Sequence, residues 1–344
     1  MNELVDPAPI RAGTMHAWIL ERYGSADDLA YREIPFPAFR DDNEVLIRVV
    51  ASSVNPVEKH ALKPMFLFRR RAGFLRPKDG RIGSDVAGRV EVVGRNVQGL
   101  HVGDEVYGVG RGSLGEFAIA DQSQVVVKPA GLSFEPAAAL PIAGVTALQG
   151  LRDQAQLRPG QRVLVNGASG GVGTFAVQIA KALGAEVSAV CSTRNVDQAR
   201  SLGAVRVFDY SKEEFTESGQ RYDLIFDLQL NRPLSAIRRI LNPQGVYLMV
   251  GAGPGNVARI VVRLLGRSLA ARIVGPRTKF YIAKITTGEL QTLSDLVGSG
   301  RLTPVIDRSY PMNQVPDALR YLIEGHARGK IVITTSDSPP GGVV

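Results

Sequence analysis

Residues 163–173 read VLVNGASGGVG, and this stretch decides the fold of the chain. Val163 to Val165 form a short apolar run, which is typical of a strand that is buried on both faces. After the glycines, apolar residues recur at helical spacing, at Val172, Ala176, Ile179, Ala180 and Leu183. A strand, a glycine-rich turn and a helix in this order predict the opening βαβ unit of a dinucleotide-binding domain.

The glycine-rich turn can be read in two registers. Ala168, Gly170 and Gly173 fill the positions of G-x-G-x-x-G with alanine first, whereas Gly167, Gly170 and Gly173 give G-x-x-G-x-x-G. In both registers a missing Cβ lets a pyrophosphate approach the backbone N–H groups and the helix dipole. The alternative is a glycine turn with a structural role only. We expect cofactor contacts from the whole turn, which comprises Ala168, Ser169, Gly170, Gly171, Val172 and Gly173.

Composition indicates a soluble globular chain of 344 residues, long enough for two domains. The hydrophobic content of 44% and the charged content of 22% are ordinary, and no apolar run is long enough to span a bilayer. Cys191 is the only cysteine, which excludes intramolecular disulfides and cysteine-rich zinc sites and favours a cytoplasmic location. The net charge of +8 suits an anionic cofactor, but equally nucleic acid or an acidic membrane.

The order of predicted elements divides the chain into domains. Strands expected at 15–20, 44–52, 86–93, 105–109 and 115–120 indicate a β-rich domain with a barrel-like core. From residue 162 strands and helices alternate, with strands at 162–166, 186–191, 205–208, 223–228 and 245–250, which predicts a doubly wound parallel sheet. We therefore expect a first domain at 14–136, a second at 137–284 and a return to the first at 285–335, with flexible tails at 1–13 and 336–344.

Six segments carry a more specific pattern. They read SVNPVE (53–58), GSDVAGRVEVVG (83–94), VGDEVYG (102–108), LPIAGVTAL (140–148), NGASGGVGTFAVQIAKALGA (166–185) and GHARGKIVIT (325–334). With them the chain resembles the medium-chain dehydrogenase/reductase superfamily, in its zinc-free quinone oxidoreductase-like branch. The resemblance implies an α/β fold, with a GroES-like catalytic domain, a Rossmann domain, a cofactor in the cleft between them, and a homodimer.

Metal ligands of the zinc-dependent members are absent from their usual positions. Where those members carry a cysteine and a His-Glu pair, this chain has Asn55 and Ser84-Asp85, and serine and asparagine are poor zinc ligands. The four histidines form no metal-ligand spacing with one another. Without a metal to polarise an alcohol, the expected reaction is hydride transfer to an already electrophilic acceptor, a quinone or an α,β-unsaturated carbonyl.

The resemblance implies catalytic roles for Asn55, Glu58 and Thr146. Asn55 would donate to the substrate carbonyl or the nicotinamide ribose, and Glu58 would orient it. Turn formation before Pro56 and a solvated carboxylate are the alternatives. Thr146 matches a position near the nicotinamide, although a role inside its own helix explains it as well. Asp85 is expected to close a turn rather than take part in chemistry.

NADPH is the expected cofactor, because the second strand of the Rossmann unit ends without a carboxylate. Cys191 is followed by Ser192, Thr193 and Arg194, and two hydroxyls with a guanidinium suit a 2′-phosphate. The alternative is that the hydroxyls cap the next helix while Arg194 points to water. The family pattern adds further cofactor contacts, at Tyr210, Asp227, Gly251, Ala252 and Lys330, although Leu228-Gln229-Leu230 is bulkier than the family's usual step after the aspartate.

Two basic segments, 65–81 and 256–279, are open to several interpretations. The first interleaves aromatic residues with arginines, which indicates a substrate-side loop, a solvated loop, or contact with nucleic acid or membrane. The second carries arginines at four-residue spacing and is expected to pack as a helix rather than bind a membrane. The alternative functions are a non-enzymatic NADPH-binding protein, structural or nucleic-acid-binding, and a zinc-free carbonyl or alcohol dehydrogenase.

Overall fold

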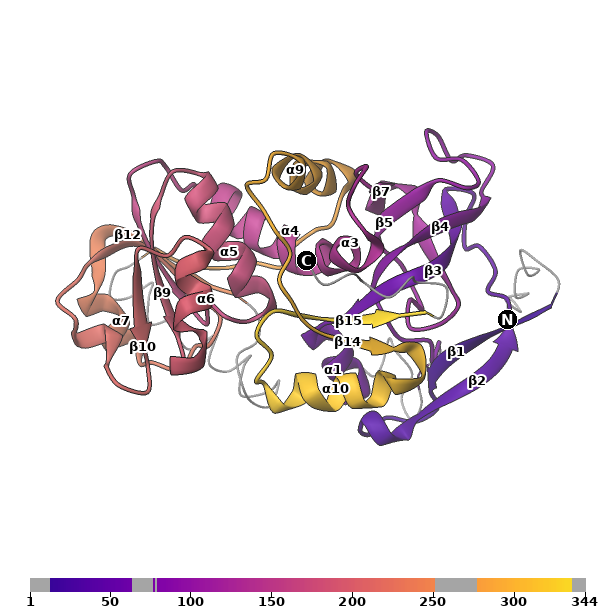
Figure 1. Cartoon of the computed structure of the whole chain (residues 1–344), viewed down its shortest axis with the longest axis horizontal. Coiled ribbons are helices and arrows are strands. Elements are labelled where there is room, and N and C mark those ends of the chain that lie inside the picture. The colour runs from indigo at the N-terminus through magenta and orange to yellow at the C-terminus, as the bar shows by residue number, and fades with distance from the viewer. Residues whose placement is uncertain (1–12, 64–76, 78, 251–276, 336–344) are drawn as a thin grey trace, which may run out of the picture. The chain divides into compact units, whose positions relative to one another are not determined.

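The computed structural model describes residues 13–63, 77, 79–250 and 277–335 (Figure 1). The chain forms two compact units. Unit 1 draws on Met1–Ile142, Ile285–Asp295 and Ile306–Val344, and unit 2 on Ala143–Lys284 and Leu296–Val305. Apart from Gly13, the predicted tails lie outside the described residues, as do Gly251, Ala252 and most of both basic segments.

Unit 1 is the β-rich part of the chain. A two-stranded sheet pairs β1 (Thr14–Leu20) antiparallel with β2 (Leu29–Pro35). A seven-stranded sheet runs in the order β14-β15-β3-β4-β5-β7, and β6 also pairs with β3. Its strands are β3 (Glu44–Val54), β4 (Asp85–Val93), β5 (Glu105–Val109), β6 (Phe117–Asp121), β7 (Val125–Val127), β14 (Ile306–Pro311) and β15 (Lys330–Thr334).

Strand β3 is the centre of unit 1, because it pairs with β4, β6 and β15. Ten of its eleven positions are buried, so the strand has no solvent face, and most of its residues are apolar. Ser52 and Ser53 are the polar exceptions near its carboxyl end, and both are fully buried. Polar side chains buried in this way need hydrogen-bond partners. Ser52 Oγ donates to the Asp85 carbonyl at 2.7 Å, and Ser53 Oγ donates to the Asp85 carboxylate at 2.6 Å.

Four longer helices belong wholly or largely to unit 1. These are α1 (Pro56–Leu62), α3 (Phe134–Ala139), α9 (Thr287–Gly298) and α10 (Val315–Glu324). Helix α3 packs against β3 and β4, and α10 lies along β14 and β15 (Figure 1). The buried Tyr107 hydroxyl on β5 donates to the Leu290 carbonyl at 2.7 Å, which fastens α9 to the sheet.

Unit 2 contains a six-stranded sheet in the order β10-β9-β8-β11-β12-β13. Every neighbouring pair is parallel. Its strands are β8 (Arg162–Asn166), β9 (Glu186–Cys191), β10 (Arg206–Asp209), β11 (Tyr222–Asp227), β12 (Leu241–Met249) and β13 (Arg277–Phe280). In chain order the strands stand as 3-2-1-4-5-6, which is the doubly wound Rossmann arrangement and confirms the predicted fold class.

Helices of unit 2 include α4 (Pro141–Gln149, which begins at the unit boundary), α5 (Gly171–Ala182), α6 (Val196–Ser201) and α7 (Leu234–Arg239). All residues of α5 from Gly173 to Ala180 are buried, so it is covered on more than the single face that its periodicity indicates. The segment Leu296–Val305 accounts for part of this cover. Gln178 donates to the Thr303 carbonyl at 3.0 Å and accepts from the Thr303 N–H at 2.9 Å.

These contacts attach Leu296–Val305 to unit 2, although the sequence places all of 285–335 with the first domain. The Gln178 side chain contributes to this attachment, because its amide satisfies both backbone groups of Thr303. The first boundary from unit 1 to unit 2 lies after Ile142, whereas the sequence predicts this boundary after residue 136. Helix α3 falls in unit 1 because it packs on β3 and β4.

Candidate active site and cofactor site

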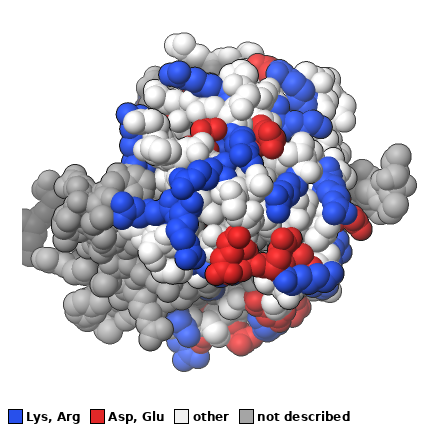
Figure 2. Space-filling view, turned by 90° about the vertical axis from the view of Figure 1, so that its left-hand side faces the viewer, with Lys and Arg blue, Asp and Glu red and all other residues white. Residues whose placement is uncertain are grey.

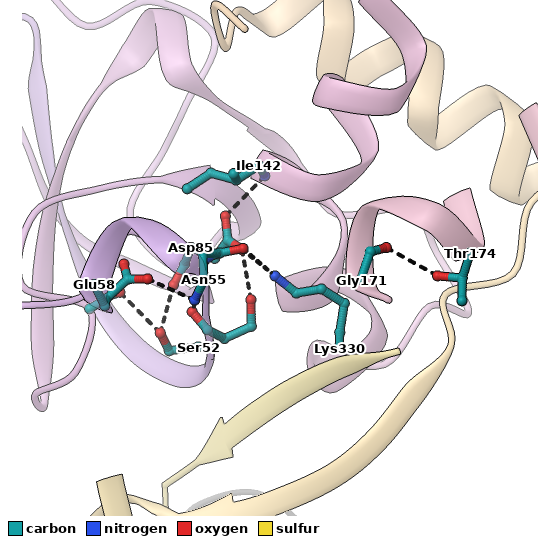
Figure 3. Close-up of polar contacts among 10 residues, drawn as sticks. Ser52, Asn55, Glu58, Asp85, Ile142, Gly171, Thr174 and Lys330 are labelled. Carbon is teal, nitrogen blue, oxygen red and sulfur yellow. Dashed lines mark hydrogen bonds and ion pairs between the residues drawn. The ribbon is translucent and has the colours of Figure 1, made fainter. Parts of the chain in front are cut away.

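Asp85 is the centre of a buried polar cluster in unit 1 (Figure 3). It begins β4 and is fully buried. Its Oδ2 atom accepts hydrogen bonds from Ser53 Oγ at 2.6 Å, Asn55 Nδ2 at 2.8 Å and Lys330 Nζ at 3.2 Å. Its Oδ1 atom accepts from the backbone N–H of Ile142 at 3.0 Å, in the first turn of α4. One carboxylate therefore ties together two strand ends, a loop residue and a helix start.

Strand pairing brings these residues together. Ser53 on β3 lies opposite Asp85 on β4 and opposite Val332 on β15. Lys330 begins β15 and is only 3% exposed, so its ammonium has to be satisfied inside the protein. It donates to the Asn55 Oδ1 atom as well as to Asp85. Pairing two buried groups of opposite charge offsets part of the desolvation penalty that either would carry alone.

A zinc ion does not fit this cluster. Asn55 and Asp85 hold the positions expected for two of the family's zinc ligands, and the lysine ammonium already bonds to both side chains. A second cation at this place would meet that charge at short range. No group of three or more His, Cys, Asp or Glu side chains suited to a metal occurs among the residues that the structure describes.

Asn55 precedes α1 and is 3% exposed. Its side-chain amide donates to Asp85 and, at 3.4 Å, to the Ser53 carbonyl, while its oxygen accepts from Lys330. Both amide hydrogens are therefore used inside unit 1. A structural role for Asn55 was the alternative that its position before Pro56 offered, but its bonds to Asp85 and Lys330 were not predicted. Its contact with substrate or ribose stays a prediction.

Glu58 lies one turn into α1 and is also 3% exposed. Its Oε2 atom accepts from the backbone N–H of Asn55 at 2.7 Å, which caps the helix. Burial raises the pKa of Glu58 to about 7, the Asp85 charge adds to this, and hydrogen bonds with Ser84 and Asn55 oppose it. A carboxyl group with this pKa is half protonated near neutral pH, whereas a solvated carboxylate would not be.

Thr146 lies in the middle of α4, in unit 2, and is half-buried. Its backbone carbonyl accepts a hydrogen bond from the Tyr281 hydroxyl. No hydrogen bond joins the Thr146 hydroxyl itself to the described part of the chain. That hydroxyl is therefore available to a ligand, as the prediction for this residue requires.

The glycine turn connects β8 to α5, and its glycines meet different steric constraints. Gly167 has φ +95°, a conformation that favours glycine. A Cβ on Gly173 would lie 2.1 Å from the Gly167 carbonyl oxygen, so this glycine allows the helix to start close to the strand. A Cβ on Gly170 would meet only that same oxygen, at an ordinary 3.8 Å, so the fold itself does not require glycine there.

The start of α5 is suited to an anion. Gly170 is the residue before the helix and has no side chain to accept from the first N–H groups. These N–H groups and the positive end of the helix dipole attract a phosphate. The open space at Gly170 is what a pyrophosphate at the backbone would need, so the residues present fit a dinucleotide cofactor.

The region after β9 contains a carboxylate that the sequence analysis missed. Asp209 ends β10, lies beside Cys191 in register, and is buried. It accepts from the Thr193 hydroxyl at 2.6 Å and from the Ser211 N–H at 3.0 Å, and Lys212 Nζ is 3.4 Å away. These contacts lower the pKa of Asp209, the Thr193 hydrogen bond most of all. The position of Asp209 at the end of the neighbouring parallel strand was the available clue.

The other residues predicted to bind the 2′-phosphate have different exposures. Arg194 and Tyr210 are exposed, with 55% of Tyr210 accessible. Ser192 is half-buried, and its hydroxyl accepts from the Asn195 side chain at 3.1 Å. The Thr193 hydroxyl donates its proton to Asp209, while the side chains of Arg194 and Tyr210 lie at exposed positions nearby in the sequence.

Asp227 ends β11 and is fully buried. Its carboxylate accepts from the Asn166 side chain, the Tyr247 hydroxyl and the N–H groups of Gln229 and Leu230, at 2.8 to 3.0 Å. The last two bonds hold the loop in which Leu230 adopts a positive φ of 52°. Asp227 therefore organises this loop, and a cofactor contact of its own stays a prediction.

Positively and negatively charged side chains both occur on the end of unit 2 that carries β10, α6 and α7 (Figure 2). Ion pairs along these elements include Arg200 with Asp197 at 3.6 Å and Arg232 with Glu214 at 2.8 Å. A surface of alternating sign is typical of a solvated face rather than of a nucleic-acid site. No helix in the described ranges has the length and apolar character needed to cross a membrane.

Comparison with known proteins matches two parts of the chain to family models. Residues 41–130 match the family model for the alcohol dehydrogenase GroES-like domain, and residues 202–333 match the model for zinc-binding dehydrogenases. A chloroplast envelope quinone oxidoreductase homolog from Arabidopsis thaliana is 35% identical over 93% of this chain and 98% of its own length. The NADPH-dependent alkenal/one oxidoreductase of Arabidopsis chloroplasts is 32% identical over 93% of this chain and 79% of its own.

Solved structures agree with these relatives. The quinone oxidoreductase from Coxiella burnetii superposes with a TM-score of 0.80 at 27% identity, over 94% of this chain and 99% of that one. The match to a zinc-binding family model stands beside a candidate site in which Lys330 bonds to Asn55 and Asp85. The family likeness therefore extends over the fold, whereas the zinc-ligand positions differ in this chain.

Proposed function

The chain belongs to the medium-chain dehydrogenase/reductase superfamily, in its quinone oxidoreductase-like branch, and from this membership we propose that it is an NADPH-dependent, zinc-independent reductase of quinones or α,β-unsaturated carbonyls. Its relatives make it an oxidoreductase that uses a nicotinamide cofactor. Zinc independence, the choice of NADPH and the class of acceptor are the parts that we propose.

The observation that carries zinc independence is the Lys330 ammonium, which bonds to Asn55 and Asp85. A fixed ammonium cannot take an alkoxide ligand or lower the pKa of a bound alcohol as a metal does. The favoured substrates are then acceptors that are electrophilic without a metal. Quinones and enones meet this requirement, and the names of the relatives point to the same two classes.

A bound nicotinamide cofactor supplies the hydride. The residues of unit 2 bind and orient it: the N–H groups at the start of α5 hold the pyrophosphate, and the Thr146 hydroxyl contacts the nicotinamide half. In unit 1, Lys330 and Asp85 keep the Asn55 amide in one orientation, so its remaining acceptor capacity is fixed in space. The contribution of the protein is chiefly the positioning of two reactants.

Selection of NADPH is proposed for Arg194 and Tyr210, the exposed groups beyond β9 and β10. An arginine fork suits a phosphate through both its charge and its geometry. Asp209 would disfavour a second negative charge nearby, but it is buried, bonded to Thr193 and Ser211, and paired with Lys212. Its charge is thus largely compensated within the protein.

The test is consumption of NADPH by the purified chain with quinones, alkenals, ketones and alcohols, before and after prolonged chelation. We expect turnover with quinones or alkenals, unchanged by chelation, and no stoichiometric zinc by elemental analysis. Loss of activity on chelation that added zinc restores would contradict zinc independence. Tight NADPH binding without turnover of any acceptor would instead favour the non-enzymatic alternative.

Two further parts of the proposal concern the whole protein. The family likeness supports a homodimer, and β13 offers an edge that pairs with no further strand among the described residues. The single cysteine, Cys191, is buried in β9 and supports a reducing location such as the cytoplasm. Direct contact with nucleic acid or a membrane forms no part of the proposal.

A further inference from the structure

Helix α4 does not end as an ordinary α-helix. It continues into η3 (Gly150–Gln154), one turn of π-helix, in which the Ala155 N–H donates to the Gly150 carbonyl five residues earlier, at 2.9 Å. Such turns are rare, and they are frequent at functional sites. This one is contacted by a later segment of unit 2.

The Tyr281 hydroxyl bonds to this part of the helix. It donates to the Thr146 carbonyl, the atom that an α-helix would pair with the N–H of Gly150. Burial raises the pKa of Tyr281, and a backbone hydrogen bond from Gly150 opposes this rise. The phenol therefore lies against the last turn of α4, with its hydroxyl bonded to the Thr146 carbonyl.

Gly150 makes room for this arrangement. A Cβ at residue 150 would lie 2.5 Å from the Tyr281 hydroxyl oxygen and 2.7 Å from a ring atom of Phe226. Further hydrogen bonds join the end of α4 and the π-turn to the segment that contains Tyr281. The Gln149 amide donates to the Lys284 carbonyl at 2.8 Å and accepts from its N–H at 3.0 Å, and Lys279 Nζ donates to the Gln154 carbonyl at 2.6 Å.

Residues 279–284 thus bond to the carboxyl-terminal half of α4 and to the turn that follows it, and the Tyr281 bond reaches furthest back along the helix, to Thr146. This bond holds the backbone of Thr146, while the Thr146 hydroxyl has no partner among the described residues. We propose that Tyr281 is a positioning residue for the nicotinamide half of the cofactor, acting through Thr146. This inference rests on the proposed function, since it needs Thr146 to contact the cofactor.

The direct test is Tyr281→Phe, which removes one hydroxyl and keeps the ring. Tyr107→Phe is the matched control, because Tyr107 is another buried tyrosine whose hydroxyl donates to a helix carbonyl, that of Leu290. Affinities are measured by titration for NADPH and for 2′-phospho-ADP-ribose, which lacks the nicotinamide ring. We expect Tyr281→Phe to weaken NADPH by a factor of about 5 to 10 and 2′-phospho-ADP-ribose by less than about twofold. Tyr107→Phe should change neither.

A double-substitution cycle then asks whether the effect passes through Thr146. Once Thr146→Ala has removed the hydroxyl, adding Tyr281→Phe should weaken NADPH no further. Equal weakening of both ligands by Tyr281→Phe, an effect matched by Tyr107→Phe, or additive effects in the cycle would each overturn the positioning role. Wild-type protein that fails to bind NADPH at all would overturn the proposed function instead, so the two failures are distinguishable.

Discussion

Glu58 shows what a single buried acid does to the stability of this fold. It caps α1 through the Asn55 N–H, and the same burial that makes the cap possible raises its pKa to about 7. In the unfolded chain its pKa returns to its ordinary value of 4.5. The folded protein therefore binds a proton at this residue between those two values, while the unfolded chain releases it.

The first prediction follows from that difference. The contribution of Glu58 to stability is fully present below pH 4.5 and is lost as the pH rises through about 7, because the charged form is then held in a buried site. Glu58→Gln keeps an acceptor for the Asn55 N–H but cannot ionise. Relative to wild type, the variant should gain up to about 3 kcal/mol of unfolding free energy between pH 5 and pH 8. Urea unfolding at both pH values measures this gain.

Glu213→Gln, at an exposed position, is the control for this experiment. A difference between Glu58→Gln and wild type that stays the same at pH 5 and pH 8 would mean that Glu58 does not titrate in this range. A variant that loses stability at both pH values, but less at pH 8 than at pH 5, would indicate that the helix cap outweighs the burial of charge.

Arg194 carries the second prediction, which concerns cofactor choice. Arg194→Ala should lose on the order of 1.5–3 kcal/mol of NADPH affinity and little NADH affinity, because only NADPH presents a 2′-phosphate. Titration of both cofactors gives the comparison, with Arg200→Ala as a control, since Arg200 is paired with Asp197 on α6. Equal weakening toward both cofactors would remove Arg194 from this role, and a wild-type preference for NADH would overturn the choice of NADPH.

The residues of the candidate site were visible in the sequence one by one, but their association was not. Asn55 and Asp85 are 30 residues apart, and Lys330 lies a further 245 residues along the chain. Only the pairing of β15, β3 and β4 brings the three together. A single sequence shows which side chains can ionise, whereas the pairing that turns Lys330 into a partner of Asp85 is a property of the sheet.

At the scale of elements, the glycine turn and α5 separate what the fold needs from what a ligand needs. Gly173 leaves no space for a Cβ, because the Gly167 carbonyl oxygen would lie 2.1 Å away. Gly170 has such space, and its φ of −80° and ψ of 175° are open to any residue. The two glycines therefore have different reasons to be glycine, although they stand in one motif.

The third prediction uses this pair. Gly170→Ala should leave the melting temperature within a few degrees of wild type, yet weaken NADPH at least tenfold, because the added methyl group occupies space at the helix start. Gly173→Ala should lower stability by about 2 kcal/mol or more through overpacking. Thermal unfolding and cofactor titration of both variants provide the comparison. Unchanged NADPH affinity in a folded Gly170→Ala protein would place the pyrophosphate elsewhere.

The sequence predicted an element correctly where its apolar residues follow a clear pattern. The five strands predicted for the Rossmann sheet are present, because each is an apolar run between glycine or polar breaks. Strands β2 and β13 were not predicted. Arg32 and Glu33 interrupt the apolar residues of β2, three of the four residues of β13 are charged or polar, and each strand pairs with one neighbouring strand. Helix α1 was not predicted either, because its seven residues include Pro56 and two consecutive basic residues.

At the scale of the whole molecule, the chain passes between the two units more than once. It leaves unit 1 after Ile142, returns at Ile285, and passes through unit 2 again over Leu296–Val305. In this last passage the Gln178 amide bonds to the backbone of Thr303, a residue 125 positions away. Domain boundaries drawn from composition cannot include such a short return, since it has no motif of its own.

The fourth prediction concerns assembly, and it starts from the two edges of the unit 2 sheet. Strand β13 forms one edge, and its outer side pairs with no other strand in the described ranges. Phe280 and Ile282, two residues apart, are 44% and 84% exposed there. An unpaired strand edge with exposed apolar side chains favours addition of a second chain.

We therefore expect a homodimer that Ile282→Lys converts to monomer, because the added charge would have to be buried at the interface. Sedimentation velocity over a range of concentrations measures the change. Val205→Lys is the matched control, since Val205 is 69% exposed beside β10, at the opposite edge of the same sheet. A dimer that survives Ile282→Lys but dissociates with Val205→Lys would place the interface at the β10 edge. A wild-type monomer would rule out the dimer, whereas the cofactor and substrate proposals would stand on their own tests.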